Sequence, residues 1–352
     1  MSKPEEYQSK QLRVGIAGYG VVGKRRHQFI DAHPALKTVA VCDKVYASEP
    51  KPVRKEGGGL IVHEDYRELL AEDLDVLFVC LPNYIAPEVT IAGLEKGLHV
   101  FCEKPPGRTV ADMERVIAVA QSCPELKLKY GFNHRYHDSV RDALKIVESG
   151  EMGPIVNMRG VYGKGMIIPY EEGGWRSERR YAGGGILLDQ GIHMLDLLRL
   201  FGGDFSEVKS FISNDYWKFD VEDNAYAILR SQSGVVAMLH SSATQWQHRF
   251  SLEIAFAQGY LKLEGILSGT KSYGEEVLMV GRRTDETTGN LTNTTTRYLQ
   301  DNSWRDEINE FAGAITGGDP VRHGLANDAL ETMRLLDRIY KADGSWTEKW
   351  DD

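Results

Sequence analysis

The sequence contains few cysteines. The four, Cys42, Cys80, Cys102 and Cys123, form no C-x-x-C pair in a chain of 352 residues. Three of them lie in apolar runs typical of strands, where a free thiol behaves as a small hydrophobic side chain. This pattern predicts a reducing, cytoplasmic environment without disulfide bonds.

Long apolar runs and an excess of positive charge are lacking as well. No apolar stretch approaches the length of a membrane-spanning helix, and residues 1–10 are too polar for a secretory signal. With 42 basic against 51 acidic residues the net charge is -9, which argues against a nucleic-acid partner. We therefore expect neither a membrane nor a nucleic acid as partner, and the length suits two domains of ordinary size.

A glycine motif follows the first apolar run. Residues 14–23 have the sequence VGIAGYGVVG, which is G-x-G-x-x-G at Gly18, Gly20 and Gly23, and Asp43 follows Gly23 after 20 positions at the end of a second apolar run. In a dinucleotide-binding fold such glycines let the backbone approach the pyrophosphate, and the acid binds the adenosine ribose hydroxyls. The motif predicts NAD as cofactor, with NADP as a possibility. A tight glycine turn in an ordinary α/β protein is the alternative.

Strands and helices alternate through the first third of the chain. The ranges 12–17, 38–42, 74–81, 98–102 and 127–132 have strand patterns, and 24–32, 87–96 and 111–123 have helical ones. Such units with short connections predict a parallel, doubly wound sheet that binds ligands at the C-terminal ends of its strands. The residues at these ends are Gly18 to Gly23, Asp43, Pro82-Asn83, Glu103-Lys104-Pro105 and Asn133.

The pattern changes beyond Gly150. Strand-like runs at 224–230, 235–240, 251–256 and 260–264, with hairpin signals between them, predict a second, largely antiparallel sheet. The threonine-rich range 284–296 is expected to form a loop. We predict an N-terminal domain over 1–133 and a C-terminal domain over 134–352, with a helix near 327–341 placed to pack back on the first domain.

Three residues have the types that a proton transfer coupled to hydride loss needs. His193 can act as the base, Asp189 can hold His193 in one tautomer or contact the substrate, and Lys104 can stabilise a developing alkoxide. Asp189 and His193 stand four positions apart in an apolar, helix-like run, which places them on one face. The charge of Lys104 is expected to lower the pKa of His193.

Simpler explanations exist for each of these residues. Asp189 and His193 could pair within a helix, and Lys104 could be an exposed lysine at a strand end. A metal site formed by His134, His137, Asp189 and His193 is less favoured, because no recognised zinc spacing is present. No metal is expected.

Together these motifs resemble the glucose–fructose oxidoreductase/inositol dehydrogenase/rhizopine-catabolism (Gfo/Idh/MocA) family. The resemblance rests on the glycine motif with Asp43, on Glu103-Lys104-Pro105, and on GGGILLDQGIHMLD at residues 183–196, and it spans nearly the whole chain. It implies an N-terminal Rossmann domain and a C-terminal α+β domain with a large open sheet that commonly forms the subunit interface of a homodimer or homotetramer. It also implies a nicotinamide cofactor, a sugar-type substrate, and a Lys104–Pro105 bond that is often cis.

The resemblance and the strand ends assign the site residues. The catalytic set is Lys104, Asp189 and His193. The expected cofactor-binding residues are Gly18, Tyr19, Gly20, Val21, Val22, Gly23, Asp43, Leu81, Pro82, Asn83, Glu103, Lys104, Asn133, Trp175 and Arg176. The expected substrate-binding residues are Lys104, Arg135, Lys164, Arg176, Arg179, Asp189 and His193. Many members have a histidine shortly after Pro82-Asn83, where this chain has Ala86, so that cofactor contact is not carried over.

Basic residues gather near the expected substrate entrance. Arg176, Arg179 and Arg180, with Lys164 in the glycine-flanked segment 163–174, suit phosphate groups, and the segment could act as a mobile lid. We therefore expect an NAD-dependent oxidoreductase of a nucleotide-linked or phosphorylated sugar. These arginines could equally form a solvated face or subunit contacts.

Two further functions remain open. A free sugar or inositol-type polyol is the alternative substrate. A non-catalytic dinucleotide-binding regulator is the alternative of another class, which the complete set of Lys104, Asp189 and His193 disfavours.

Overall fold

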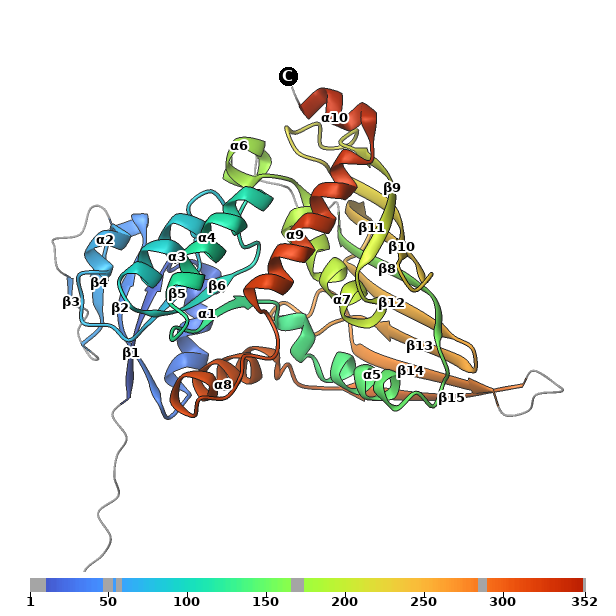
Figure 1. The fold of residues 1–352 in the computed structure, drawn as a ribbon, viewed down its shortest axis with the longest axis horizontal. Coiled ribbons are helices and arrows are strands. Elements are labelled where there is room, and N and C mark those ends of the chain that lie inside the picture. The colour runs from blue at the N-terminus through green and yellow to red at the C-terminus, as the bar shows by residue number, and fades with distance from the viewer. Residues whose placement is uncertain (1–10, 47–52, 55–58, 166–173, 284–289, 351–352) are drawn as a thin grey trace, which may run out of the picture.

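A computed structural model of the chain describes residues 11–46, 53–54, 59–165, 174–283 and 290–350. Two sheets lie side by side, with a long late helix, α9, running between them (Figure 1). None of the helices in these ranges is long and apolar enough to span a membrane.

The first sheet has the strand order β3-β4-β2-β1-β5-β6-β7. All neighbours pair in parallel except β3 and β4. The strands are β1 (Leu12–Ala17), β2 (Leu36–Cys42), β3 (Val53–Arg54), β4 (Ile61–His63), β5 (Val76–Val79), β6 (His99–Glu103) and β7 (Leu128–Gly131). The chain reverses its direction of strand addition between β1 and β5, which leaves a ligand crevice at their C-terminal ends. This sheet confirms the predicted Rossmann architecture.

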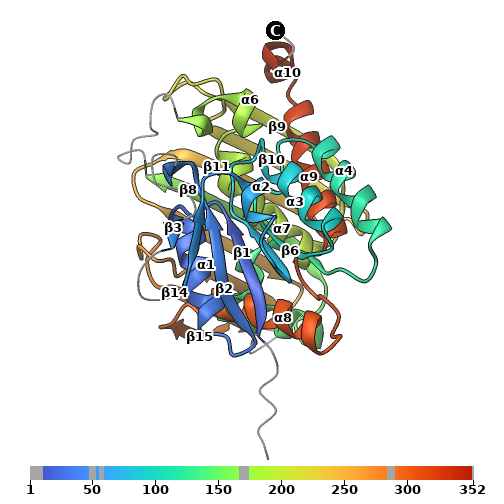
Figure 2. The same cartoon turned by 90° about the vertical axis from the view of Figure 1, so that its left-hand side faces the viewer.

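Helices cover both faces of the first sheet, as Figure 2 shows from the side of this sheet. They are α1 (Val21–Asp31), α2 (Tyr66–Leu69), α3 (Ala86–Glu95), α4 (Val110–Ser122) and α8 (Ser303–Thr316). α8 follows the second sheet in sequence, yet its Phe311 packs against Phe78 of β5 and Phe101 of β6, at ring-centroid distances of 5.9 and 5.6 Å. The strands are nearly continuous apolar runs because both of their faces are buried.

The second sheet has the order β15-β14-β13-β12-β8-β11-β10-β9. Its strands are β8 (Ile155–Gly165), β9 (Phe205–Ser213), β10 (Asn224–Ser231), β11 (Val236–Gln245), β12 (Arg249–Phe256), β13 (Gly259–Glu264), β14 (Glu276–Arg283) and β15 (Leu291–Tyr298). Only β8 and β11 pair in parallel, so the predicted large, mostly antiparallel sheet is confirmed.

One face of the second sheet packs against helices and the other is open. The covering helices are α5 (Asp138–Ser149), α7 (Ile192–Gly202) and α9 (Ala326–Lys341). On the open face, neighbouring strands carry the exposed apolar side chains Phe211, Tyr226, Ile228 and Met238. The remaining helical segments are η1 (Lys44–Tyr46), η2 (Asn133–Tyr136), η3 (Trp175–Ser177), α6 (Arg179–Ala182), η4 (Leu187–Gly191) and α10 (Gly344–Trp350).

The loop prediction for residues 284–296 is wrong over 291–296. These residues belong to β15, which pairs antiparallel with β14 at the edge of the sheet. Their side chains are exposed, so no buried face imposes an alternation of apolar residues, although threonine suits an extended strand. Residues 284–289 lie outside the described ranges.

Candidate active site

A cavity of about 860 Å³ lies at the C-terminal ends of the strands of the first sheet and extends to residues of the second sheet. Most of the predicted site residues line it. These are Gly18, Gly20, Val21, Val22, Asp43, Leu81, Pro82, Asn83, Glu103, Lys104, Asn133, Trp175, Arg176, Asp189 and His193. Residues from both expected domains therefore meet in one space.

Five predicted residues do not line the cavity, namely Tyr19, Gly23, Arg135, Lys164 and Arg179. The glycine motif explains two of them: the main-chain N–H of Tyr19 donates to Asp43 Oδ2 at 2.8 Å, and a Cβ on Gly23 would come within 2.0 Å of the carbonyl oxygen of Gly18. Lys164 Nζ lies 3.0 Å from Asp189 Oδ2, so Lys164 acts on the cavity through a lining residue. The main-chain N–H of Arg179 donates to Asp220.

Arg135, the fifth, is oriented toward two carboxylates. Its guanidinium donates to both oxygens of Asp196, at 2.6 and 2.7 Å, and to Asp328 at 3.1 Å. Arg135 is buried, and Asp328 belongs to α9. This arrangement joins η2, α7 and α9, and it occupies the hydrogen-bonding capacity that a substrate contact would need.

The glycine motif has the geometry that binding of a dinucleotide requires. Gly18 has a φ of +90°, and a Cβ there would lie 2.3 Å from the carbonyl oxygen of Cys80, so only glycine fits. A Cβ on Gly20, at the N-cap of α1, would meet no atom within 4 Å, and Gly20 faces the cavity without a capping side chain. The open N-terminus of α1 and the carboxylate of Asp43 at the end of β2 therefore fit the phosphates and a ribose.

Lys104 connects the two halves of the cavity. It directly follows β6, its bond to Pro105 is cis as the resemblance implies, and its Nζ donates to the main-chain oxygen of Asp189 at 2.5 Å. Burial lowers the pKa of Lys104, while the carboxylates of Asp189 and Glu103 act in the opposite direction. The ammonium group thus faces the cavity at the junction of the two sheets.

The carboxylate of Asp189 is held by cations rather than by His193. Lys164 Nζ donates to its Oδ2 at 3.0 Å, and Arg176 Nε lies 4.0 Å from its Oδ1. Burial works to raise the pKa of Asp189, but Lys164, Lys104 and Arg176 outweigh it and keep the carboxyl ionised. Asp189 therefore presents a negative charge, already paired with Lys164, to the cavity.

Asp189 and His193 were expected to pair, but no hydrogen bond joins their side chains within the ranges that the structure describes. The helix between them contains a π turn, η4, so the four-residue spacing does not have ordinary α-helical register. His193 Nδ1 is buried and has no hydrogen-bond partner in the described part of the chain. Burial lowers the pKa of His193 well below its usual value, and Lys104 and His137 lower it further. His193 is therefore neutral near pH 7.

Several cavity residues were not assigned to the site from the sequence. His134 and His137 were considered only as metal ligands, and Tyr162 lies on β8, a strand that the sequence analysis did not predict. No group of histidines, cysteines and carboxylates suited to a metal is found within the described residues. Tyr273 also approaches the catalytic region, since its hydroxyl donates to Gln190 at 2.7 Å.

The predicted basic cluster is only partly directed at the cavity. Arg180 pairs with Glu178 at 2.8 Å, and Lys164 pairs with Asp189. Arg176 lines the cavity and lies over the ring of Trp175, at 4.4 Å. Residues 166–173 of the expected lid lie outside the described ranges.

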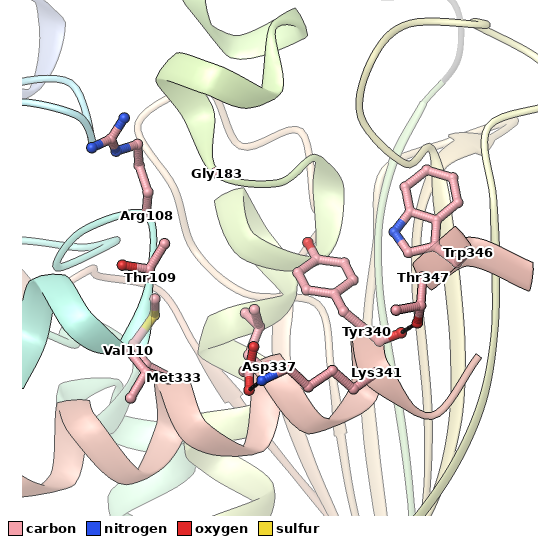
Figure 3. A pocket seen from close by; sticks show the side chains of 11 residues that line it. Arg108, Thr109, Val110, Gly183, Met333, Asp337, Tyr340, Lys341, Trp346 and Thr347 are labelled. Atoms are coloured by element: carbon pink, nitrogen blue, oxygen red, sulfur yellow. Dashed lines mark hydrogen bonds and ion pairs between the residues drawn. The ribbon is translucent and has the colours of Figure 1, made fainter. Parts of the chain in front are cut away.

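A second cavity of about 160 Å³ lies between α4, α9 and α10. Figure 3 shows the rings of Tyr340 and Trp346 on one side of it and Thr109 with Arg108 on the other. It shares no lining residue with the first cavity. The hydroxyl of Tyr340 donates to Glu222 at 2.8 Å, and Glu222 also accepts from the main-chain N–H groups of Gly185 and Leu187 just before Asp189.

Two family models match the chain. Residues 12–130 match the oxidoreductase family with an NAD-binding Rossmann fold, and residues 140–262 match the GFO/IDH/MocA C-terminal domain. The chain is 30% identical to D-glucoside 3-dehydrogenase of Escherichia coli K12, over 66% of this chain and 71% of that protein. It is 32% identical to 1,5-anhydro-D-fructose reductase of Ensifer adhaerens, over 70% and 72% of the two chains.

Solved structures share the whole fold. Levoglucosan dehydrogenase in complex with NADH superposes with a TM-score of 0.82 at 23% identity, covering 96% of this chain and 98% of that one. KijD10, a 3-ketoreductase from Actinomadura kijaniata in complex with NADP and TDP-benzene, gives a TM-score of 0.79 at 24% identity, covering 95% and 98%.

Proposed function

The chain belongs to the GFO/IDH/MocA family of NAD-binding oxidoreductases, and from this premise we propose that it interconverts a secondary hydroxyl and a ketone on a sugar or polyol. The observation that carries the proposal is the convergence of Lys104, Asp189 and His193 on the cavity that the glycine motif also lines. The names of the two curated relatives, one for a glucoside and one for an anhydro sugar, support this substrate class.

In the proposed reaction the substrate loses a hydride from the hydroxyl-bearing carbon and a proton from the hydroxyl oxygen, each to a different acceptor. A nicotinamide cofactor held by the glycine motif and Asp43 would supply the hydride acceptor for that carbon. His193, which is neutral, accepts the hydroxyl proton, and the ammonium group of Lys104 stabilises the negative charge that develops on the oxygen. In the reverse direction the same imidazole returns the proton to the oxygen.

We propose that Asp189 orients the substrate and does not orient the imidazole of His193. Its carboxylate is ionised and can accept a hydrogen bond from a second hydroxyl next to the reacting carbon. Lys164 can donate to the same region, since its Nζ lies 3.0 Å from Asp189. A substrate with neighbouring hydroxyls, as in a sugar ring or a cyclitol, satisfies both groups.

An uncharged sugar or polyol is the substrate that the charge distribution favours. Of the basic residues expected to bind a phosphate, Lys164 and Arg180 face carboxylates. A nucleotide-linked or phosphorylated sugar is the second candidate, and two observations favour it: Arg176 lines the cavity, and KijD10, with the same fold, was solved with a TDP compound. A regulator without turnover would not need the groups at Lys104 and His193.

The open face of the second sheet is proposed to form a subunit interface in a homodimer or homotetramer. Ile228 and Met238 lie directly opposite each other on β10 and β11 and are 52% and 49% exposed. Together with Phe211 and Tyr226 they form an apolar surface on adjacent strands, which in a protein outside a membrane marks an interaction site.

One screen tests the catalytic proposal. The purified chain is incubated with NAD⁺ or NADP⁺ and with free sugars, anhydro sugars, glycosides, inositols or nucleotide sugars, and formation of the reduced cofactor is followed by absorbance. We expect turnover with an uncharged sugar or polyol and its loss in Lys104→Met. A wild-type chain that binds cofactor but turns over no member of the panel in either direction would contradict the proposal.

A further inference from the structure

The ring of His134 lies parallel to the ring of His193. Their centroids are 3.7 Å apart and the planes differ by 12°, which is a face-to-face stack. The ring of Phe132 approaches His193 edge-on at a centroid distance of 6.2 Å. Tyr162 also approaches His193, at a centroid distance of 6.4 Å. Since Asp189 is bonded to Lys164, these rings, with His134 in the shortest contact, set the orientation of the His193 imidazole.

A directional chain of hydrogen bonds determines the tautomer of His134. It begins at the carboxylate of Asp301, which accepts from the hydroxyl of Ser303 at 2.6 Å. The oxygen of Ser303 can then only accept, and it accepts from Asn133 Nδ2 at 3.1 Å. This leaves Asn133 Oδ1 facing His134 Nδ1 at 3.2 Å. An amide oxygen cannot donate, so His134 Nδ1 carries the hydrogen.

The other nitrogen of His134 completes the chain. Its Nε2 lies 3.1 Å from the hydroxyl of Tyr162. With the hydrogen on Nδ1, a neutral ring has a lone pair on Nε2, and Tyr162 donates to it. Burial lowers the pKa of His134 well below its usual value, and His193, His137 and Lys104 lower it further. The ring is therefore neutral and both of its nitrogens are occupied.

We propose that His134 is the positioning residue for His193: a neutral imidazole, locked in one tautomer by the chain from Asp301 to Tyr162, that holds the plane of the base and shields one of its faces from water. The inference rests on the proposed role of His193 as base. His134 does not relay the proton to or from His193, because the two rings lie face to face and the nitrogens of His134, which bond in the plane of the ring, point to Asn133 and Tyr162. His134 thus orients His193, a role that the sequence analysis had assigned to Asp189.

The charged and titratable groups around this pair are few. Lys104 faces both rings, and His137 meets His134 edge-on at a centroid distance of 5.5 Å while its Nδ1 pairs with Glu276 at 2.7 Å. Among the described residues, Asp189, Tyr162 and Tyr273 lie on neighbouring elements, and Arg135 and Asp196, on the elements of His134 and His193, pair with each other. The pKa of His193 is therefore lowered by burial, to which the stacked ring of His134 contributes, and by Lys104 and His137.

Two substitutions of His134 distinguish the effect of its stacked ring from the effect of its hydrogen bonds. His134→Ala removes the ring and admits water, whereas His134→Phe keeps a flat ring without nitrogens. In protein labelled with ¹⁵N-histidine, nuclear magnetic resonance reports the tautomer of each ring and its pKa without any turnover. His99→Ala is the matched control, since His99 is half-buried at the opposite end of β6 and its Nδ1 accepts from the main-chain N–H of Lys127.

The expected results are specific for each variant. Wild-type His134 shows the Nδ1–H tautomer at pH 7, and His193 titrates well below 6.5. In His134→Ala the pKa of His193 rises toward 6.5, the acid limb of kcat/KM moves with it, and kcat falls about 10²-fold with little change in KM. In His134→Phe a ring still covers His193, so the pKa of His193 stays low and kcat falls less than in His134→Ala. In His99→Ala both quantities stay as in the wild type.

Two outcomes would overturn the inference. One is a wild-type His134 in the Nε2–H or doubly protonated form at pH 7. The other is a His193 that titrates in His134→Ala as it does in the wild type, or that responds equally to Ala and Phe. If the wild-type chain turns over no sugar, the proposed function fails, and the resonance data still decide the role of His134.

Discussion

Lys104 Nζ donates a hydrogen bond of 2.5 Å to the main-chain oxygen of Asp189, so the end of β6 in the first sheet is bonded directly to the turn that precedes His193. The two residues are separated by 85 positions in the chain. Because this bond uses the backbone of Asp189, it leaves the Asp189 carboxylate to Lys164 and the cavity. Lys104 therefore joins the first sheet to the turn that carries Asp189 and precedes His193.

Replacing Lys104 with methionine should remove most of the turnover and leave cofactor binding intact. The loss of one preorganised positive charge at a developing alkoxide costs about 10²–10³ in kcat. The glycine loop and Asp43 do not depend on Lys104, so the dissociation constant of NAD, measured by fluorescence titration, should change less than about threefold. Lys96→Met, at the exposed end of α3, is the control. Turnover of Lys104→Met close to that of wild type would exclude the assigned role.

The stability of the fold should depend on pH through His134 with a defined sign. Its folded-state pKa lies well below the usual 6.5, so between these two values the unfolded chain binds a proton that the folded chain excludes. The contribution of His134 to the free energy of unfolding is therefore full above about pH 6.5 and decreases as the pH falls. The difference in unfolding free energy between wild type and His134→Phe should therefore shrink by about 1 kcal/mol from pH 6.5 to 5.5.

Glu222 supplies a control of opposite sign for this measurement. Burial raises its pKa to about 7, while Tyr340 and two main-chain N–H groups act in the other direction. A raised carboxyl pKa favours the folded state below about 4.5, and this contribution is lost as the pH rises through about 7. The difference between wild type and Glu222→Gln should grow as the pH falls from 7. Equal pH dependence in all three chains would contradict both assignments.

Asp43 should make the chain prefer NAD over NADP. Its carboxylate lies at the end of β2 on the cavity, where it can accept from ribose hydroxyls and would repel a 2′-phosphate. Lys44, also on the cavity, is the group that could favour the phosphate. Asp43→Asn keeps the acceptor for the N–H of Tyr19 and should reduce the ratio of the two dissociation constants at least about tenfold. Equal affinities of wild type for both cofactors would refute the prediction.

Arg176 and Arg180 should differ in their effect on substrate binding. If the substrate carries a phosphate, Arg176→Gln should weaken its apparent affinity by about 10 to 100-fold, because a charged hydrogen bond is lost, and raised salt should imitate the change in part. Arg180→Gln breaks the pair with Glu178 and the contact with the ring of Tyr181, neither of which lines the cavity, so it should leave affinity unchanged and serves as the control. An uncharged sugar predicts little salt dependence in any of the three chains, so the salt series distinguishes the two substrate classes.

Acidic residues introduced on the open face of the second sheet should dissociate the proposed oligomer. Ile228→Glu together with Met238→Glu places two carboxylates on opposite positions of β10 and β11. We expect wild type to run as a dimer or tetramer and the double variant as a monomer, measured by light scattering after gel filtration. Leu325→Glu, at an exposed position before α9, tests for a general effect of added charge. A wild-type monomer at all accessible concentrations would rule out the interface.

The sequence by itself determined those features that depend on neighbouring residues. The bounds of β1 at Leu12–Ala17 agree with the predicted strand, and the glycine loop, Asp43 and Lys104 line the cavity as expected. These assignments succeed because apolar periodicity, a left-handed glycine and the end of a parallel strand are local properties. Edge strand β15 was missed for the same reason, since no buried face marks its sequence.

Only the tertiary structure decided which partner each polar side chain has. Arg135 binds Asp196 and Asp328, Lys164 binds Asp189, and His134 stacks on His193. Each partnership depends on how helices and sheets from distant parts of the chain pack together, and a π turn changes the register on which the pairing of Asp189 with His193 had been predicted. Sequence spacing fixes neighbours along one element, whereas the distance between two elements is set by the side chains buried between them.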